Sequence, residues 1–168
     1  MQRRAILSLS ATAAALSLSG CGFALRKAPN FAFSTLFSSL GEGSPLGVEL
    51  RRSLQSTRKV EVISDPRRIA EAQVILEVLS DQREKVVLST NASGQVREFQ
   101  LRLRFRFRLR TLAGKELIPD TEILQQRDIS FNESAVLAKE AEEALLYRDM
   151  QGDVVQQIMR RLAAVTEL

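Results

Sequence analysis

The stretch "FQLRLRFRFRLR", Phe99–Arg110, alternates apolar and polar residues without interruption. Because successive side chains of a strand point to opposite faces, it predicts a strand with one hydrocarbon face and one arginine face. The apolar positions are Phe99, Leu101, Leu103, Phe105, Phe107 and Leu109, and Gln100 is followed by Arg102, Arg104, Arg106, Arg108 and Arg110. Burying each Leu or Phe contributes roughly 1.5–3 kcal/mol. We therefore expect helices to cover the apolar face, which becomes the centre of the core, and to leave the arginine face uncovered.

The composition of the chain excludes several classes of site. The 168 residues fit one domain, and 26% charged with 45% apolar residues indicates a globular protein. With no histidine and one cysteine, the chain cannot build a His/Cys zinc site, a Ser-His-Asp triad or an internal disulfide. The paired carboxylates Glu142 and Glu143 fit a solvated helix face better than acid–base chemistry. We expect no cofactor, no metal and no enzymatic activity.

The N-terminal residues are typical of a bacterial lipoprotein signal. Arg3 and Arg4 precede a short apolar stretch, "AILSLSATAAALSLS", which is too short to span a bilayer comfortably. "LSGC" follows, namely Leu18, Ser19, Gly20 and Cys21, and it resembles a lipobox whose cysteine is lipidated and becomes the new N-terminus. We predict that residues 1–20 are cleaved and that Cys21 anchors a single domain, 21–168. The residue after Cys21 is Gly22 and not Asp, which resembles lipoproteins that are sorted to the outer membrane. We therefore predict that the protein is anchored on the periplasmic side of the outer membrane.

The pattern of the mature chain predicts an α+β fold with a mostly antiparallel four-stranded sheet and two helices packed on one face. We expect strands at residues 31–37, 60–63, 72–88, 96–111 and 116–131, the last an edge strand because of Pro119. A short helix is expected from Pro45, capped by Ser44, to about Ser56. A long helix is expected from Asn132 to about Val165, with Gly152 as its weak point.

Registers counted from the two hairpin loops give acidic neighbours to four of the five arginines. "LAG", 112–114, sets Thr111 opposite Lys115, and "NASG", 91–94, sets Thr90 opposite Gln95. The resulting pairs are Arg110–Glu116, Arg106–Asp120, Arg104–Glu122, Arg108–Glu77 and Arg104–Asp81, with Phe107 on Val78 and Leu109 on Leu76. Exposed ion pairs contribute only about 0–1 kcal/mol. We expect these pairs to set the register more than to stabilise the fold.

For the fifth arginine of the strand, Arg102, the registers predict basic rather than acidic neighbours. The same registers place Arg102 opposite Arg83 and beside Leu124, with Lys85 on the same face and Arg97 near the hairpin tip. Like charges opposite each other destabilise a sheet. Arg83, Lys85, Arg102 and Arg97 are therefore our candidates for an anion site. The alternative is that these long side chains simply extend into water.

The start of the mature chain, "CGFALR", residues 21–26, resembles the outer-membrane LptE (RlpB) family of lipoproteins. The order of elements, the "GQ" at Gly94-Gln95 and the "IP" at Ile118-Pro119 are similar too. The resemblance implies a non-enzymatic lipoprotein that forms a heterodimer with the β-barrel LptD, plugs its lumen and binds lipopolysaccharide. Lipid A carries phosphates, which Arg and Lys bind well, and our hypothesis is that Arg83, Lys85 and Arg102, together with Arg97, make that contact.

Two other functions are compatible with parts of the sequence. A row of five arginines fits a nucleic-acid backbone, but the mature chain carries a formal charge of only about +2, and its basic face has no aromatic residue for base stacking. A structural lipoprotein could instead dock another envelope protein or the cell wall without binding lipopolysaccharide. We expect no nucleic-acid partner. Co-purification with a barrel distinguishes the LptE-like function from that of a structural lipoprotein.

Overall fold

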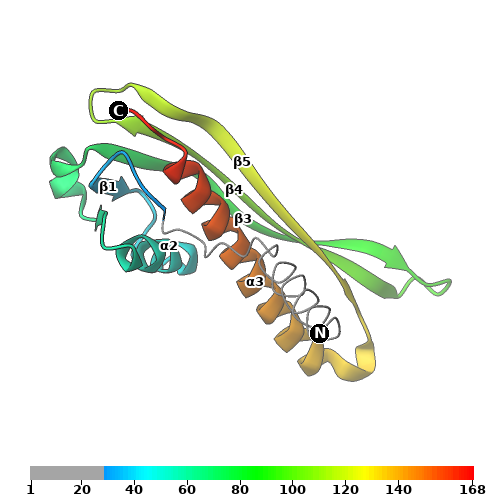
Figure 1. The fold of residues 1–168 in the computed structure, drawn as a ribbon. Helices are drawn as coiled ribbons and strands as arrows, with labels where there is room; N and C mark the ends of the chain where they lie inside the picture. Colours follow the sequence, from blue (N-terminus) through cyan, green and yellow to red (C-terminus); the bar gives the residue numbers. More distant parts are fainter. Residues whose placement is uncertain (1–28) are drawn as a thin grey trace, which may run out of the picture.

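A computed structural model describes residues 29–168. The predicted signal peptide and lipobox and the "CGFALR" motif lie outside the described residues. The elements are β1 (Thr35–Ser38), α2 (Pro45–Ser56), β2 (Glu61–Ile63), η1 (Pro66–Glu71), β3 (Val74–Thr90), β4 (Val96–Thr111), β5 (Glu116–Ser130), η2 (Glu133–Ala135) and α3 (Val136–Ala163). Figure 1 shows a long, twisted ribbon of β3, β4 and β5 with α3 lying diagonally across it.

The sheet is mixed and has five strands in the order β2-β1-β3-β4-β5. The predicted α+β class is confirmed, but the four-stranded, mostly antiparallel sheet is wrong in detail. β1 pairs in parallel with both β2 and β3, whereas β3–β4 and β4–β5 are antiparallel. The reason is the connection: β1 reaches β2 through helix α2, and a helical crossover returns the chain in the same direction, as a tight turn cannot.

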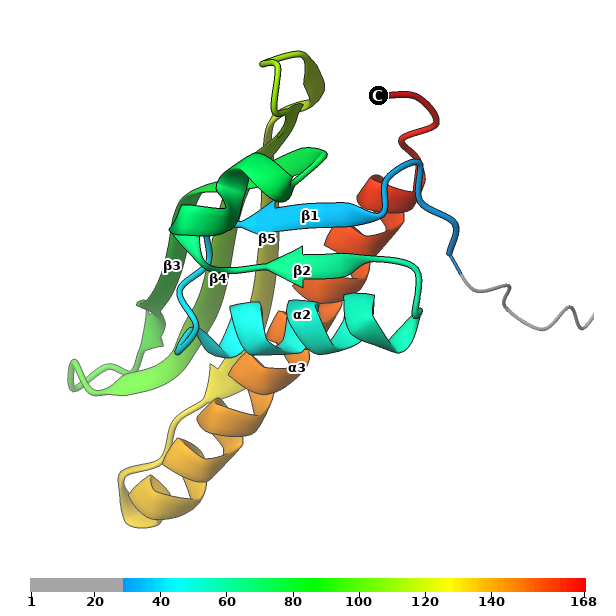
Figure 2. The ribbon, with the colours of Figure 1, turned by 90° about the vertical axis from the view of Figure 1, so that its left-hand side faces the viewer.

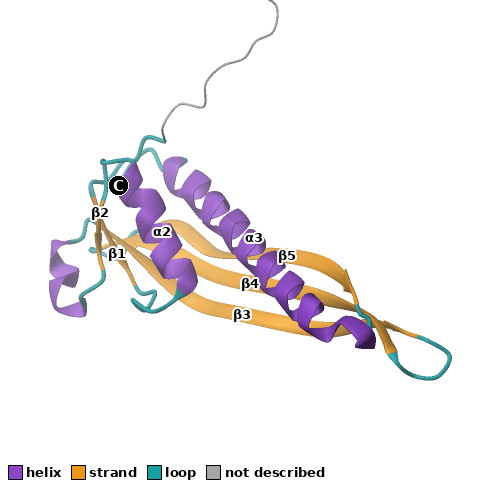
Figure 3. Cartoon of the chain, turned by 90° about the horizontal axis from the view of Figure 1, so that it is seen from below, coloured by secondary structure: helices purple, strands orange, loops and turns teal. Residues whose placement is uncertain are grey.

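Both helices lie on one face of the sheet, as Figure 3 shows from below. The apolar residues of β4 from Leu101 to Leu109 are at most 1% exposed. They share one core cluster with Leu46, Leu50 and Leu54 of α2 and with Ile158 and Leu162 of α3. The predicted core is therefore confirmed. A smaller cluster of Phe37, Ile63, Ala72 and Ile75, with Ile69 of η1, lies apart from it.

The ends of the two helices follow local rules. Pro45 is the first residue of α2, and the Ser44 hydroxyl accepts a hydrogen bond from the Gly47 N–H at 3.3 Å, as predicted. Asn132 caps the short η2, not α3 itself, by accepting from the Ser134 N–H at 3.0 Å. α3 runs unbroken through Gly152, so the predicted weak point does not interrupt the helix. A Cβ at Gly152 would lie 3.4 Å from Glu49 Oε1 of α2, which is an ordinary van der Waals contact.

The β3–β4 register is as predicted from Leu76 to Val78, near the start of β3, and differs after that point. Glu77 pairs with Arg108, Val78 with Phe107, and Leu76 with Leu109. A β-bulge at Leu79 then adds one residue to β3, so that Arg83 pairs with Leu103 and Glu84 with Arg102. The predicted Thr90–Gln95 pair is also wrong, because Thr90 pairs with Val96. A bulge leaves one residue unopposed, so the side chains of β3 from Ser80 to Val87 take the face opposite to the predicted one, up to the next register shift after Val87.

The β4–β5 register starts as predicted and then shifts by two residues. Thr111 N–H donates to Lys115 O at 2.8 Å, Gly114 takes a φ of +95°, and Arg110 pairs with Glu116. Irregularities near Pro119 then set Arg106 opposite Glu122 and Arg104 opposite Leu124. Proline has no N–H to give the ladder, which is why the irregularity falls there. A shift of two residues keeps each side chain on its predicted face.

Candidate functional site

The outer face of the sheet, opposite the helices, carries the arginine row in ion pairs. Arg104 donates to Glu122 at 3.2 Å, Arg106 pairs with Asp120, and Arg108 and Arg110 both donate to Glu77, at 2.5 and 2.6 Å. The pairs Arg104–Glu122, Arg106–Asp120 and Arg108–Glu77 are confirmed, the first two as diagonal contacts across the shifted register. Arg110 turns to Glu77 instead of its backbone neighbour Glu116. The row is therefore a charged but largely compensated surface.

Glu77 is the carboxylate shared by two arginines. Its burial would raise its pKa, but hydrogen bonds from Arg110 and Arg108 outweigh that effect and hold the pKa below its ordinary value. Glu77 is therefore ionised at neutral pH and ties the base of β3 to β4.

The Arg104–Asp81 pair is wrong. Asp81 lies beyond the Leu79 bulge, opposite Phe105 and on the helix side of the sheet. Burial raises its pKa there, and the charge of Arg83 opposes that rise. The bulge thus separates Asp81 from the arginine row.

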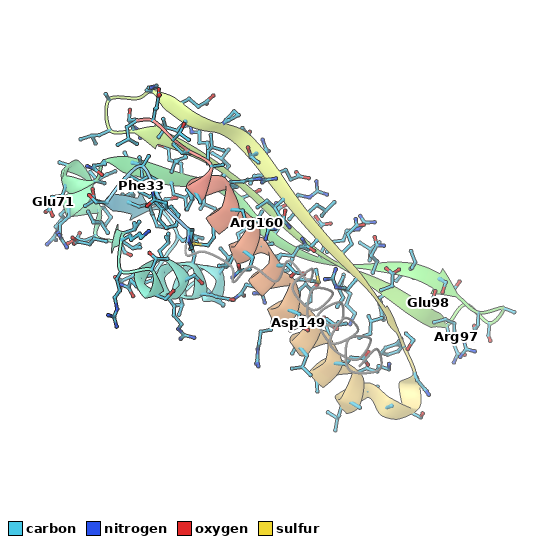
Figure 4. The ribbon with its side chains drawn as sticks, in the orientation of Figure 1. Phe33, Glu71, Arg97, Glu98, Asp149 and Arg160 are labelled. Carbon is cyan, nitrogen blue, oxygen red and sulfur yellow. The ribbon has the colours of Figure 1, made fainter. Side chains whose placement is uncertain are left out.

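The same bulge separates the four predicted anion-site residues. Arg83 and Lys85 face α3, while Arg102 stays on the outer face, opposite Glu84 and Gln126. Arg102 donates through Nε to Gln100 Oε1 at 2.8 Å. Arg97 is exposed in the projecting hairpin, as Figure 4 shows. The predicted Arg102–Arg83 contact is therefore wrong, and the four cations do not form one patch.

Arg83 enters a polar network between β3 and both helices. It donates to Gln151 Oε1 at 3.0 Å, and Gln151 Nε2 donates to Glu49 Oε2 at 2.8 Å. Its guanidinium also lies 5.4 Å from the ring centroid of Tyr147, in cation–π geometry. The Tyr147 hydroxyl donates to Glu84 O at 2.8 Å, and burial raises the pKa of Tyr147, which keeps that proton in place. This network is the polar counterpart of the apolar core.

Next to this network, a groove runs between the N-terminal half of α3 and the helix-covered face of the sheet. It consists of two adjoining hollows of about 250 and 460 Å³ that share Lys85, Glu140 and Glu143. The smaller hollow has an apolar floor of Phe99, Ile129, Phe131 and Val136, with Lys139 at its rim. The larger one is lined by Arg83, Ala144 and Tyr147.

The cations of the groove are held over apolar surface. Lys85 donates to Glu143 Oε2 at 2.6 Å and lies 4.4 Å from the Phe99 ring centroid. Lys139 donates to Ser130 Oγ at 3.0 Å and to Glu142 Oε2 at 2.9 Å. Ammonium groups beside an apolar floor suit an amphiphile with an anionic head and a hydrocarbon body.

The sequence prediction missed Lys139, Tyr147 and Gln151, all on α3. One signal could have found Gln151: it is a polar residue on the apolar stripe of the helix, and it is only 7% exposed. A polar group at such a position needs hydrogen-bond partners. Lys139 carried no comparable signal, because it stands among exposed charges.

Within residues 29–168 no three His, Cys, Asp or Glu side chains are grouped as metal ligands. No helix in this range has the length and hydropathy needed to cross a membrane. The groove itself is lined by charged and apolar side chains, which suit binding through charge and apolar contact.

Comparison with known proteins identifies the family. The model of the family LptE, described as lipopolysaccharide-assembly, matches residues 30–162. The chain belongs to the LptE family. The resemblance proposed from "CGFALR" and the order of elements is thus confirmed over most of the chain, and this LptE-family chain is a lipoprotein of lipopolysaccharide assembly.

Several relatives of this LptE-family chain cover it almost fully. LPS-assembly lipoprotein LptE of Yersinia enterocolitica is 29% identical over 97% of this chain and 78% of its own length. LPS-assembly lipoprotein LptE of Pectobacterium atrosepticum is 26% identical over 97% of this chain and 88% of its own length. These names support the predicted class of envelope lipoproteins.

Solved structures of similar chains share the fold. The solution NMR structure of lipoprotein B from Nitrosomonas europaea is 36% identical, covers 86% of this chain and 92% of its own, and has a TM-score of 0.72. The crystal structure of rare lipoprotein B from Shewanella oneidensis, at 23% identity, covers 77% and 92%, with a TM-score of 0.62. The second likeness shows the fold alone. The mixed sheet with its helices on one side is thus shared beyond this chain.

Proposed function

We propose that this chain is an outer-membrane lipoprotein, anchored through Cys21 on the periplasmic side, that assembles with LptD and binds lipopolysaccharide. The observation that carries the proposal is the LptE family match across residues 30–162. The lipobox at Leu18–Cys21 supports the anchor, because the one cysteine of the chain stands at its end. Gly22 supports sorting to the outer membrane.

The two faces of the sheet support a role as a plug. The lumen of a transmembrane barrel is polar. A domain inside it must bury its apolar face under its own helices and present polar groups outward, and this chain does both. The outer face offers the arginine row with its acidic partners. We propose that this face meets the wall of LptD.

We place the lipopolysaccharide contact at the groove beside α3, with Arg83 and Lys85 as its phosphate-binding cations. The ammonium of Lys85 lies above Phe99, so one ligand can meet both a positive charge and apolar surface. Binding there exchanges the Lys85–Glu143 ion pair for a phosphate contact. Arg102 and Arg97 lie elsewhere, and we propose that they make separate, weaker contacts.

A pull-down tests the assembly. The lipidated protein is tagged in its native host, purified in mild detergent, and its partners are identified by mass. A stoichiometric large outer-membrane barrel is the expected result. Recovery of only cell-wall or soluble periplasmic partners would contradict the proposal and favour the structural-lipoprotein alternative.

Lipopolysaccharide binding is tested by three variants. Arg83→Ser with Lys85→Ser should weaken binding of purified lipopolysaccharide at least about tenfold, since each charged contact contributes roughly 1.5–3 kcal/mol. Arg102→Ser should have a smaller effect, and Arg67→Ser, exposed on η1, none. Equal binding by the groove double variant and the Arg67→Ser control would refute the groove as the binding site.

A further inference from the structure

A second set of exposed cations lies where the described chain begins. Figures 2 and 3 show that the C-terminal ends of α2 and α3 and the start of the described chain gather at one end of the molecule. Lys59 Nζ donates to Asn30 Oδ1 at 3.2 Å and to Pro29 O at 3.4 Å, which fixes the chain start beside the end of α2. We call this region the basic end; its exposed cations are Arg52, Arg58, Lys59 and Arg160.

In the described part of the chain, no cation of the basic end has an acidic partner within 4.0 Å. Among the carboxylates of the adjoining elements, Glu61 pairs with Arg68 and Asp153 with Arg127, whereas Glu49 accepts a hydrogen bond from the neutral amide of Gln151 and keeps its charge. The arginine row, in contrast, is matched with acids on its own sheet. The basic end therefore carries uncompensated positive charge, while the more arginine-rich face does not.

The predicted lipid anchor at Cys21 lies close in sequence to the basic end. Pro29 follows Cys21 by eight residues, and a fully extended chain of that length spans at most about 28 Å. If Cys21 is lipidated, as the proposed function requires, the basic end must stay near the membrane surface. The tip of the β3–β4 hairpin lies at the opposite end of the molecule (Figure 3).

We propose that, before the chain assembles with a barrel, the basic end rests on the anionic phospholipid headgroups of the membrane that carries the anchor and so orients the domain. Arg and Lys side chains are attracted to anionic lipid, and the attraction fades within a Debye length, about 8 Å at physiological ionic strength. The tether, at most about 28 Å long, lets the cations reach that range, and the attraction then holds them there. When the basic end contacts the headgroups, the tip of the β3–β4 hairpin points away from them. Orientation is thus set by charge, and the acyl chains supply attachment.

The test uses the full lipidated protein in vesicles. Because Cys21 is the chain's one cysteine and carries the lipid, Gln55→Cys at the end of α2 or Ser93→Cys at the hairpin tip can take a single nitroxide label. Vesicles contain phosphatidylethanolamine and phosphatidylglycerol at roughly three to one, with a trace of nickel-chelating lipid. In neutral vesicles phosphatidylcholine replaces phosphatidylglycerol. The label at position 55 should show several-fold stronger relaxation by nickel than the label at 93.

Matched variants separate local charge from net charge. Arg52→Ser, Lys59→Ser and Arg160→Ser together should reduce relaxation at position 55 to its value in neutral vesicles. Arg67→Ser, Lys115→Ser and Arg148→Ser remove the same charge from other exposed sites and should leave it unchanged. Equal relaxation at positions 55 and 93, or no effect of the basic-end variant, would overturn the inference.

Failure of this inference can be told apart from failure of the proposed function. If a barrel co-purifies normally with the basic-end triple variant and Cys21 carries acyl chains by mass, a negative vesicle result rejects only the orientation. If Cys21 carries no lipid, the tether argument falls together with the proposed anchor.

Discussion

At the scale of single residues, Phe105 shows why the alternating strand forms the core. Its side chain is 0% exposed and shares the core cluster with residues of both helices. Leu124 is an apolar residue of β5 beside Arg104 that stays 41% exposed on the outer face. Two apolar residues on neighbouring strands thus differ in burial because they face opposite sides of one sheet.

Phe105→Ala should lower the free energy of unfolding by about 3–5 kcal/mol, since it removes a buried ring and leaves a cavity. Leu124→Ala should change it by less than about 0.5 kcal/mol. Urea denaturation followed by circular dichroism measures both. Similar losses for the two variants would contradict the assignment of faces.

Glu77 predicts a pH dependence. Its pKa is lowered in the folded protein, so the stability it contributes is present above the ordinary glutamate pKa of 4.5 and is lost as pH falls through the folded value. Glu77→Gln should therefore be less stable than the wild type at pH 7, and the difference should shrink steadily below pH 4.5. Thermal unfolding across pH 3–7 measures it. A difference that stays constant with pH would show that the carboxylate charge is not involved.

At the scale of elements, α3 is held in two different ways. Its C-terminal half buries Val154, Val155, Ile158 and Leu162 in the core, whereas residues 136–149 include no fully buried side chain among those described. The N-terminal half is fixed by polar contacts, including Lys85–Glu143 and Tyr147–Glu84. Gln151 lies at the boundary and joins β3 to α2. We expect the two halves to open with different free energies.

Gln151→Ala should lower stability by about 1–3 kcal/mol, because it leaves Arg83 and Glu49 without their amide partner. Hydrogen exchange should become faster in residues 136–149 and change little in 154–162. Gln156→Ala, exposed on the same helix, is the control. Uniform acceleration along α3 would mean that the helix opens as one unit.

At the scale of the whole molecule, the domain presents one side for its own stability and the other for contact. The helices cover the apolar face, and the outer face keeps its arginine row in compensated pairs. Exchanging Arg106→Asp with Asp120→Arg keeps both the ion pair and the net charge. Stability should therefore change by less than about 1 kcal/mol.

The same double variant should reduce recovery of LptD if the outer face meets the barrel, since the order of charges is reversed. Recovery in the pull-down, normalised to expression, measures this effect. The matched control exchanges Arg127→Asp with Asp153→Arg, a pair on the helix side of the sheet. Full recovery with the outer-face variant would place the contact on another surface.

The sequence was sufficient for features that depend on nearby residues. The period-two pattern of residues 99–110 gave the buried face of β4, because side-chain alternation is a property of any extended strand. Ser44-Pro45 gave the start of α2, and Gly114 gave the second hairpin loop. The family was accessible as well, since "CGFALR" and the order of elements are themselves sequence features.

The bulge at Leu79 and the parallel pairing of β1 were set by packing between distant segments. The alternation of β3 gave no sign of a bulge at Leu79. The bulge turns Arg83 and Lys85 toward Gln151 and Glu143, which stand 68 and 58 residues later. That single inserted residue turned one predicted patch into two separate surfaces and created the groove. Composition and alternation therefore fixed which residues are apolar and which strand is central, while the face taken by each β3 cation depended on contacts with a helix far along the chain.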